Sequence, residues 1–293
     1  MTTTPVAVPA GPKARRRRST PYWKVWLPYV GIGAIVIYCL APFYWMVVSA
    51  LRRPTDQFER RFVPSHWSLE NFKAVFKPGV GFERNLLNSV IVAGTTTLLT
   101  LIVGTFAAYA LARLEFRGKN LALAVIIATS MFPVIALVVP LLKLFTQIHW
   151  INTYQSMILP SLSFVLPLAV WNLTVFFRQM PFELEQAALI DGCTPGQAFR
   201  KVIMPLAAPG VFTTAILAFI AAWNEFLIAL TMVNQKEMRT ATVAVSLFTG
   251  ATNFDQPYGT QMAAGVIVTI PLVIAVLLFQ RRIIAGLTAG GVK

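Results

Sequence analysis

The sequence predicts an all-α, polytopic membrane protein with six transmembrane helices. Of its 293 residues, 56% are hydrophobic and only 12% are charged, which is about half the charged fraction of a typical soluble domain. Mean hydropathy is +0.66. Six apolar stretches are each long enough to cross a hydrocarbon layer about 30 Å thick.

The first apolar stretch, residues 25–50, follows an arm of residues 1–24 that is rich in Thr, Pro and Ala and then strongly basic. A basic run before an apolar stretch can also open a signal peptide, but this stretch is too long for a signal core. We therefore expect a disordered cytoplasmic arm, a membrane domain over residues 25–285 and a cytoplasmic tail over residues 286–293.

Five further stretches complete the expected set of spans. They lie at about 86–112, 121–145, 155–177, 209–232 and 260–280. Several contain proline, which a membrane bundle tolerates because kinks and neighbouring helices satisfy the freed backbone groups. The second span is rich in small residues, Gly104 and Ala108 among them, so we expect other helices to approach it closely.

The formal net charge is +14, which in a soluble protein would suggest binding to nucleic acid. Here the basic residues stand at the ends of apolar stretches, so we assign them to membrane orientation and expect no nucleic-acid partner. Retained Lys and Arg mark cytoplasmic loops. The basic arm places both termini in the cytoplasm, although the segment of residues 51–85 is also basic and argues the other way.

Residues 179–208 lie between the fourth and fifth spans and have a helical pattern of their own. A first short helix is predicted from Pro181 to Asp191, with Pro181 in its first turn and Gly192 at its end. One face of this helix is nearly free of large side chains, so a partner can approach it. That face consists of Leu184, Ala187, Ala188 and Asp191.

A second short helix is predicted to restart at Thr194. Thr194 is a good N-cap, Pro195 suits the first helical position, and Gln197 completes a capping box. We expect Met204-Pro205 to end this helix and Pro209 to open the fifth span. The result would be a rigid cytoplasmic helix-turn-helix over about residues 181–205.

At these residues the chain resembles the integral permeases of bacterial ABC importers. Their signature is Glu-Ala-Ala, three residues, Gly, nine residues and Ile-x-Leu-Pro. Here Gln186-Ala187-Ala188, Gly192 and Val202-Ile203-Met204-Pro205 keep both spacings, with Gln in place of the acid. The resemblance implies docking of this segment in a groove of an ATPase subunit. Either a hydrogen bond from the Gln186 amide or a charge contribution from neighbouring Glu185 is expected to replace the lost ion pair. The residues implied in ATPase coupling are Glu185, Gln186, Ala187, Ala188, Asp191, Gly192 and Pro205.

Other segments are similar to the maltose- and trehalose-type permeases, specifically to the second permease subunit. They are residues 64–72, residues 223–226 and the C-terminal stretch 280–293. In that subclass the tail reaches toward the ATPase dimer, which implies contacts by Gly286, Leu287 and Thr288. Thr249-Gly250 and the tail favour a trehalose-type member.

The resemblance implies a type I ABC importer permease fold in a bacterial inner membrane. The implied partners are a second homologous permease, two ATPase subunits and an extracellular sugar-binding protein. Because the sequence has no Gly-x-x-x-x-Gly-Lys-Ser/Thr loop, ATP and Mg²⁺ are expected on the partner ATPase. This chain is expected to carry no cofactor and to be no enzyme.

Glu225 is the only acid well inside a predicted span. An intramembrane acid is a functional candidate by default, and a helix–helix hydrogen bond, for instance with Asn224, is the structural alternative. The two interpretations remain open. Because a sugar is neutral, hydrogen-bonding groups and aromatic faces suffice to hold it, and the pathway candidates are Trp223, Asn224, Glu225, Trp171 and Asn172.

Two other classes of protein compete with the importer. An ion-coupled secondary transporter of a small solute would place ionisable groups and broken helices at mid-membrane, often in repeated halves. The single Glu225 and the absence of a visible repeat disfavour it. The second competing class is a membrane scaffold that binds an ATPase but transports no solute. No metal ligand set or catalytic set can be assembled, since the histidines, His66 and His149, and the cysteines, Cys39 and Cys193, stand apart.

Overall fold

The computed structural model describes residues 22–248 and 257–289, with side chains from 26 to 280 in these ranges. Three predicted segments lie outside the described residues: the arm up to residue 21, Thr249-Gly250 and the last four residues of the tail. The described chain divides into two units, which are treated separately below. One ends at Trp45 and the other begins at Met46. All described elements are helical apart from one isolated bridge between Arg52 and Trp67.

Helix α1 (Tyr22–Ala50) contributes its first 24 residues to the first unit. Its part from Trp26 onward is long and apolar enough to cross a membrane. Its apolar side chains face outward; Tyr38, for example, is 83% exposed. An apolar surface of this kind requires lipid or another protein around it.

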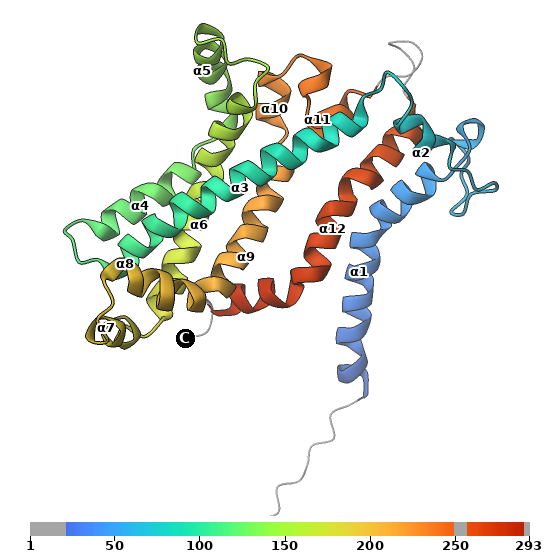
Figure 1. The fold of residues 1–293 in the computed structure, drawn as a ribbon. Helices are drawn as coiled ribbons and strands as arrows, with labels where there is room; N and C mark the ends of the chain where they lie inside the picture. The colour runs from blue at the N-terminus through green and yellow to red at the C-terminus, as the bar shows by residue number, and fades with distance from the viewer. Residues whose placement is uncertain (1–21, 249–256, 290–293) are drawn as a thin grey trace, which may run out of the picture. The chain divides into compact units, whose positions relative to one another are not determined.

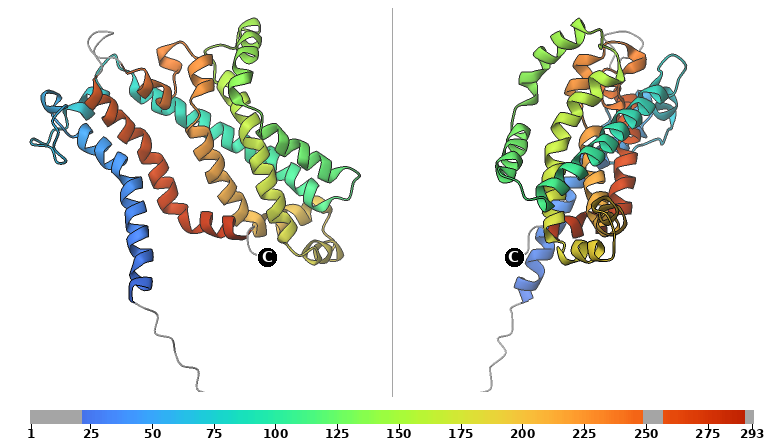
Figure 2. Two further views of the ribbon diagram at one scale, coloured as in Figure 1. Left: turned by 180° about the vertical axis from the view of Figure 1, so that it is seen from behind. Right: turned by 60° about the vertical axis from the view of Figure 1, so that its left-hand side comes forward.

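The second unit is built around α3 (Phe82–Arg113), α6 (Tyr154–Gln179) and α9 (Met204–Trp223). These three helices pack against one another, and α12 (Tyr258–Ala289) packs on α9. Figure 1 and both views of Figure 2 show them side by side. Within the described residues, and counting α1, five helices are long and apolar enough to span a membrane, or six if one bent pair counts as a span.

Small residues on α3 permit the close packing predicted for the second span. Gly104 faces α6, where a Cβ would stand 3.6–3.8 Å from Leu166, Ala169 and Leu173. Ala108 is fully buried in a cluster with Phe177 of α6 and with residues at the start of α9. A methyl group at position 104 would therefore sit in ordinary van der Waals contact with α6, so only small residues fit between the two helices at this separation.

The predicted third span, residues 121–145, is interrupted by a sharp bend. It is divided into α4 (Lys119–Ser130) and α5 (Val134–Gln147), which meet at 86°. Pro133 stands at the break and is the N-cap of α5. Proline disfavours a helical conformation in the residue before it and cannot donate a backbone hydrogen bond, so α4 ends here.

The predicted fifth span, residues 209–232, is wrong in its bounds. Helix starts at Pro195 and continues to Trp223, through α8 (Pro195–Ala198), the π-helical segment η2 (Phe199–Ile203) and α9. Met204-Pro205 therefore does not end a helix. In η2 the amide of Met204 bonds to the carbonyl of Phe199, and this wider turn leads the chain past Pro205. After Trp223 the chain breaks before α10 (Leu227–Met232).

Short elements gather at both ends of the second unit. One end carries η1 (Pro54–Asp56), α2 (Glu70–Val75), η3 (Lys236–Met238) and α11 (Ala241–Ser246) together with α10. The other carries α7 (Glu183–Ile190) and α8, where α3 and α6 end and α9 begins (Figure 1). The predicted connecting helices therefore lie together at one end of the bundle.

Candidate functional site: a helix-turn-helix at one end and a cavity between the spans

The predicted helix-turn-helix is present, and its turn has the chemistry that the sequence indicated. Cys193 donates its backbone N–H to the carbonyl of Ala188 at 3.0 Å, and Gly192 donates to Leu189 at 3.1 Å. Gly192 has a φ of +86°. These bonds form a Schellman motif, which favours glycine at this position because its left-handed backbone strains a residue with a Cβ.

The second helix begins with the predicted capping box. The Thr194 hydroxyl accepts from the amide of Gln197 at 3.3 Å, and the Gln197 side chain accepts from the amide of Thr194 at 2.9 Å. Two orphan donors at the start of α8 are thereby satisfied. Because α8 continues through η2 into α9 without a break, this cap also begins a helix that reaches deep into the bundle.

The predicted coupling residues fall on two sides of this segment. The exposed ones are Gln186, Ala187, Asp191, Gly192 and Pro205. Ala188 is 5% exposed and Glu185 is 9% exposed. The predicted partner-facing surface of α7 therefore keeps Leu184, Ala187 and Asp191 but loses Ala188, which packs against this chain.

Of the two expected replacements for the charge missing at Gln186, the structure disfavours Glu185. The Glu185 carboxylate points inward, where the hydroxyl of Tyr109 donates a hydrogen bond to Oε1 and Arg113 stands 3.8 Å from Oε2. A carboxylate already paired inside the chain offers no charge to the outer surface. Sequence reasoning missed this pairing because Tyr109 and Arg113 are more than 70 positions away along the chain.

Sequence reasoning also missed the apolar side chains that α7 exposes. At its C-terminal end Ile190 is 86% exposed and Leu189 43%, and at its N-cap Phe182 is 47% exposed. Leu189 and Ile190 immediately precede Asp191, one of the predicted coupling residues. Exposed apolar side chains mark an interaction surface, and their presence in a segment predicted to lie outside the membrane was the available signal.

A cavity of about 420 Å³ opens between α6 and α9. Trp171 and Asn172 of α6 line it together with Glu225, which follows α9. The Asn172 amide donates to the hydroxyl of Thr214 on α9 at 2.9 Å. Three of the five predicted pathway residues thus meet at one place, in walls that are otherwise mainly apolar.

The other two predicted pathway residues, Trp223 and Asn224, do not line this cavity. Trp223 is 2% exposed and packs on Phe219, with 5.5 Å between the ring centroids. Asn224 donates its side-chain amide to the carbonyl of Ile220 in its own helix at 2.8 Å. In this conformation both side chains have structural contacts.

Glu225 has a structural contact that neither interpretation of the sequence anticipated. Its carboxylate accepts from the backbone amides of Ile228 at 2.7 Å and Ala229 at 3.0 Å. These amides belong to the first turn of α10, so Glu225 caps that helix in the break after Trp223. The expected helix–helix bond to Asn224 is not what holds the carboxylate.

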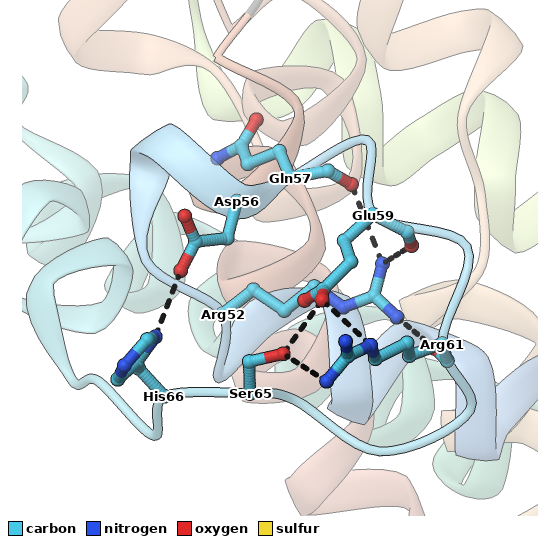
Figure 3. A network of polar contacts seen from close by, with 7 residues as sticks. All are labelled: Arg52, Asp56, Gln57, Glu59, Arg61, Ser65 and His66. Atoms are coloured by element: carbon cyan, nitrogen blue, oxygen red, sulfur yellow. Dashed lines mark hydrogen bonds and ion pairs between the residues drawn. The ribbon is translucent and has the colours of Figure 1, made fainter.

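The opposite end of the unit is held by a polar network in residues 52–66 (Figure 3). The guanidinium of Arg52, which is 1% exposed, donates to the backbone carbonyls of Gln57, Glu59 and Arg61. His66 stands 3.4 Å from Asp56. This arrangement folds the loop onto itself, and no cluster of three metal-ligating side chains occurs in the part of the chain that the structure describes.

Together the fold and the site define a helical membrane protein with a cavity between its spans and a capped helix-turn-helix at one end. The model of the binding-protein-dependent transport system inner membrane component family matches residues 100–288. The trehalose transport system permease protein SugB of Mycobacterium tuberculosis is 44% identical over 94% of this chain and 98% of its own length. The trehalose/maltose transport system permease protein MalG of Thermococcus litoralis is 43% identical, over 89% of this chain and 95% of its own.

The chain therefore belongs to the family of binding-protein-dependent transport system inner membrane components. A solved structure of a bacterial ABC transporter that imports the acidic polysaccharide alginate contains a chain of the same fold. The match has a TM-score of 0.76 at 19% identity and covers 90% of this chain and 98% of that one. The predicted all-α ABC importer permease fold is thus confirmed.

Proposed function

We propose that this chain is one of two permease subunits of an ATP-driven importer for a disaccharide of the trehalose or maltose type. The two relatives that share 43–44% of its residues carry such sugars in their names. A second homologous permease would complete the translocation pathway, and an extracellular sugar-binding protein would deliver the sugar. Both termini would lie in the cytoplasm of a bacterial cell, and the protein would sit in the inner membrane.

The observation that carries this proposal is the continuity of helix from Pro195 to Trp223. An ATPase subunit that docks on α7 and moves would push on a stiff segment, and α9 is the direct extension of that segment. ATP and Mg²⁺ would bind to two such ATPase subunits. This chain would contribute the docking surface and no catalytic group, and Gly286, Leu287 and Thr288 would contact the same ATPase dimer.

The docking surface would consist of Gln186, Ala187 and Asp191 with the exposed apolar side chains of Leu189 and Ile190. Small and apolar residues permit the close approach that an interface core requires. Gly192 shapes the turn at the edge of this surface, and Pro205 stands further along the same helix-turn-helix. A hydrogen bond from the Gln186 amide would replace the ion pair that an acid forms in the family pattern.

The cavity beside Trp171, Asn172 and Glu225 would form this subunit's part of the sugar pathway. An aromatic face and neutral hydrogen-bonding groups suit a sugar ring. A competing function, ion-coupled transport, would require Glu225 to exchange a cation or a proton. Both oxygens of its carboxylate already accept backbone amides, which favours a capping role.

Transport by the complete complex in proteoliposomes tests the proposal. The complex should accumulate radiolabelled trehalose only when the sugar-binding protein is outside and ATP is inside, and an uncoupler should leave uptake unchanged. Maltose and sucrose serve as competing sugars. Uptake that follows an imposed ion gradient without ATP would contradict the proposal.

A further inference from the structure

The last two turns of α3 are tied to the helix-turn-helix by a buried polar cluster. Tyr109 donates its hydroxyl hydrogen to Oε1 of Glu185 on α7, and Nε of Arg113 lies 3.8 Å from Oε2 of the same carboxylate. The side chains of Arg113 and Glu185 are only 5% and 12% exposed. These three residues are called the α3–α7 clasp below.

The α3–α7 clasp also reaches the two segments that flank α7. Arg113 donates to the carbonyl of Met180 at 3.0 Å, and its guanidinium lies 5.6 Å from the centre of the Phe182 ring. The Tyr109 ring packs edge-on against Phe199 of η2, with 4.7 Å between the centroids. The end of α3 therefore contacts the chain before, within and after α7.

Because the contact between Glu185, Tyr109 and Arg113 is buried, water cannot easily replace a lost partner. A charged acceptor strengthens the hydrogen bond from the tyrosine hydroxyl, and loss of one partner leaves the other charge uncompensated in a dry site. The hydrogen bond from the Tyr109 hydroxyl fixes the orientation of the Glu185 carboxylate. The Arg113 guanidinium, 3.8 Å from the other carboxylate oxygen, adds an ion pair without a hydrogen bond.

We propose that Tyr109, Arg113 and Glu185 are positioning residues that transmit movement of the ATPase from α7 to α3. This inference rests on the proposed function, since it assigns a second route for the force that α7 receives. The first route is the continuous helix from α8 into α9. The clasp makes α3 move with the helix-turn-helix, so that α3, which packs on both α6 and α9, shifts together with α9, one wall of the cavity.

The N-terminal end of α3 contacts the loop between α10 and α11. A helix of 32 residues spans about 48 Å, and at its start the amides of Asn85 and Asn88 hold the carbonyls of Lys236, Glu237 and Arg239. Displacement of α3 therefore reaches the loop between α10 and α11. The clasp at one end and this loop at the other are joined by a single rigid element.

The coupling ratio, ATP hydrolysed per sugar imported, tests the inference in the complete reconstituted complex. Tyr109→Phe should lower trehalose import about tenfold, the factor expected for a lost charge-assisted hydrogen bond. ATP hydrolysis and copurification of the ATPase should persist, so the coupling ratio should rise. Because both residues act in one contact, Tyr109→Phe with Glu185→Gln should be no worse than the poorer single variant.

Thr97→Val is the control, because it removes a buried 2.7 Å hydrogen bond from a hydroxyl to the carbonyl of Ala93 within α3 itself. It should keep the wild-type coupling ratio. Wild-type coupling in Tyr109→Phe, or equal uncoupling in both variants, would overturn the inference. A wild-type complex that neither binds an ATPase nor imports sugar would instead refute the proposed function.

Discussion

Gly259 of α12 lies so close to Asn71 of α2 that a Cβ added to the glycine would stand 2.7 Å from both amide atoms of the asparagine. Asn71 is itself fixed, because its side chain donates to the carbonyls of Ala50 at 3.0 Å and Arg52 at 2.7 Å. This contact joins the start of the last long helix to the loop that follows α1.

Substitution of Gly259 by alanine is expected to destabilise the protein by about 1–3 kcal/mol, because the new methyl group must displace a hydrogen-bonded amide. Thermal unfolding in detergent should show a lower midpoint than that of the wild type. Gly94→Ala is the control, since nothing lies within 4 Å of its added Cβ. Equal midpoints for the two variants would show that the α2–α12 contact is looser than described.

Replacement of Gly192 by alanine is expected to cost about 1–2 kcal/mol of local stability through its left-handed backbone alone. There is space around the added Cβ, so overpacking does not contribute. Hydrogen exchange over residues 187–198 should become faster. Gly196→Ala is the control, because its added Cβ has the same open surroundings and its backbone has no positive φ; its hydrogen exchange should be no faster than that of the wild type. Wild-type exchange rates in Gly192→Ala would contradict the Schellman turn.

Asn88→Leu is expected to release the loop of residues 236–239, because two backbone carbonyls would lose their buried donor. The cost is about 1–3 kcal/mol. Trypsin should then cleave after Lys236 or Arg239 faster than in the wild type. An unchanged cleavage rate would mean that the hydrogen bonds from Asn85 alone keep the loop in place. Gln235→Ala, at an exposed neighbouring position, controls for local sequence effects.

Asn172→Ala tests whether the cavity between α6 and α9 is part of the sugar pathway. If it is, the KM for trehalose import should rise about tenfold, as for one lost hydrogen bond to a bound ligand, while ATP hydrolysis without sugar stays unchanged. Thr231→Val is the control, because that hydroxyl bonds within its own helix. A variant with a normal KM and only a lower unfolding midpoint would show that Asn172 stabilises the fold and does not bind the sugar.

Local signals predicted much of this molecule. The capping box at Thr194, the turn at Gly192 and the small residues of α3 each involve a few neighbouring positions or one helix face, and all are present. The helix breaks were harder to predict from the sequence. Pro133 breaks the predicted third span, whereas Pro205 is accommodated by a π-helical turn, and the sequence around a proline does not distinguish these outcomes.

Long-range pairings could not be predicted, and they decide the roles of the charged residues. Glu185 was expected to face a partner and instead meets Tyr109 and Arg113. Glu225 was expected either in a pathway or between helices, and it caps α10 in a break that hydropathy did not reveal. In both cases the side chain's surroundings come from elements that only the fold brings together.

Cross-linking from Ala187→Cys most directly tests the central claim that α7 is the docking site of a separate ATPase in the cytoplasm. The native cysteines, Cys39 and Cys193, are first replaced by serine, and membranes that contain the whole complex are treated with a short bifunctional thiol reagent. We predict a cross-link to the ATPase subunit and no labelling by an impermeant thiol reagent added to intact cells. Labelling from outside, with no cross-link to the ATPase, would contradict the account.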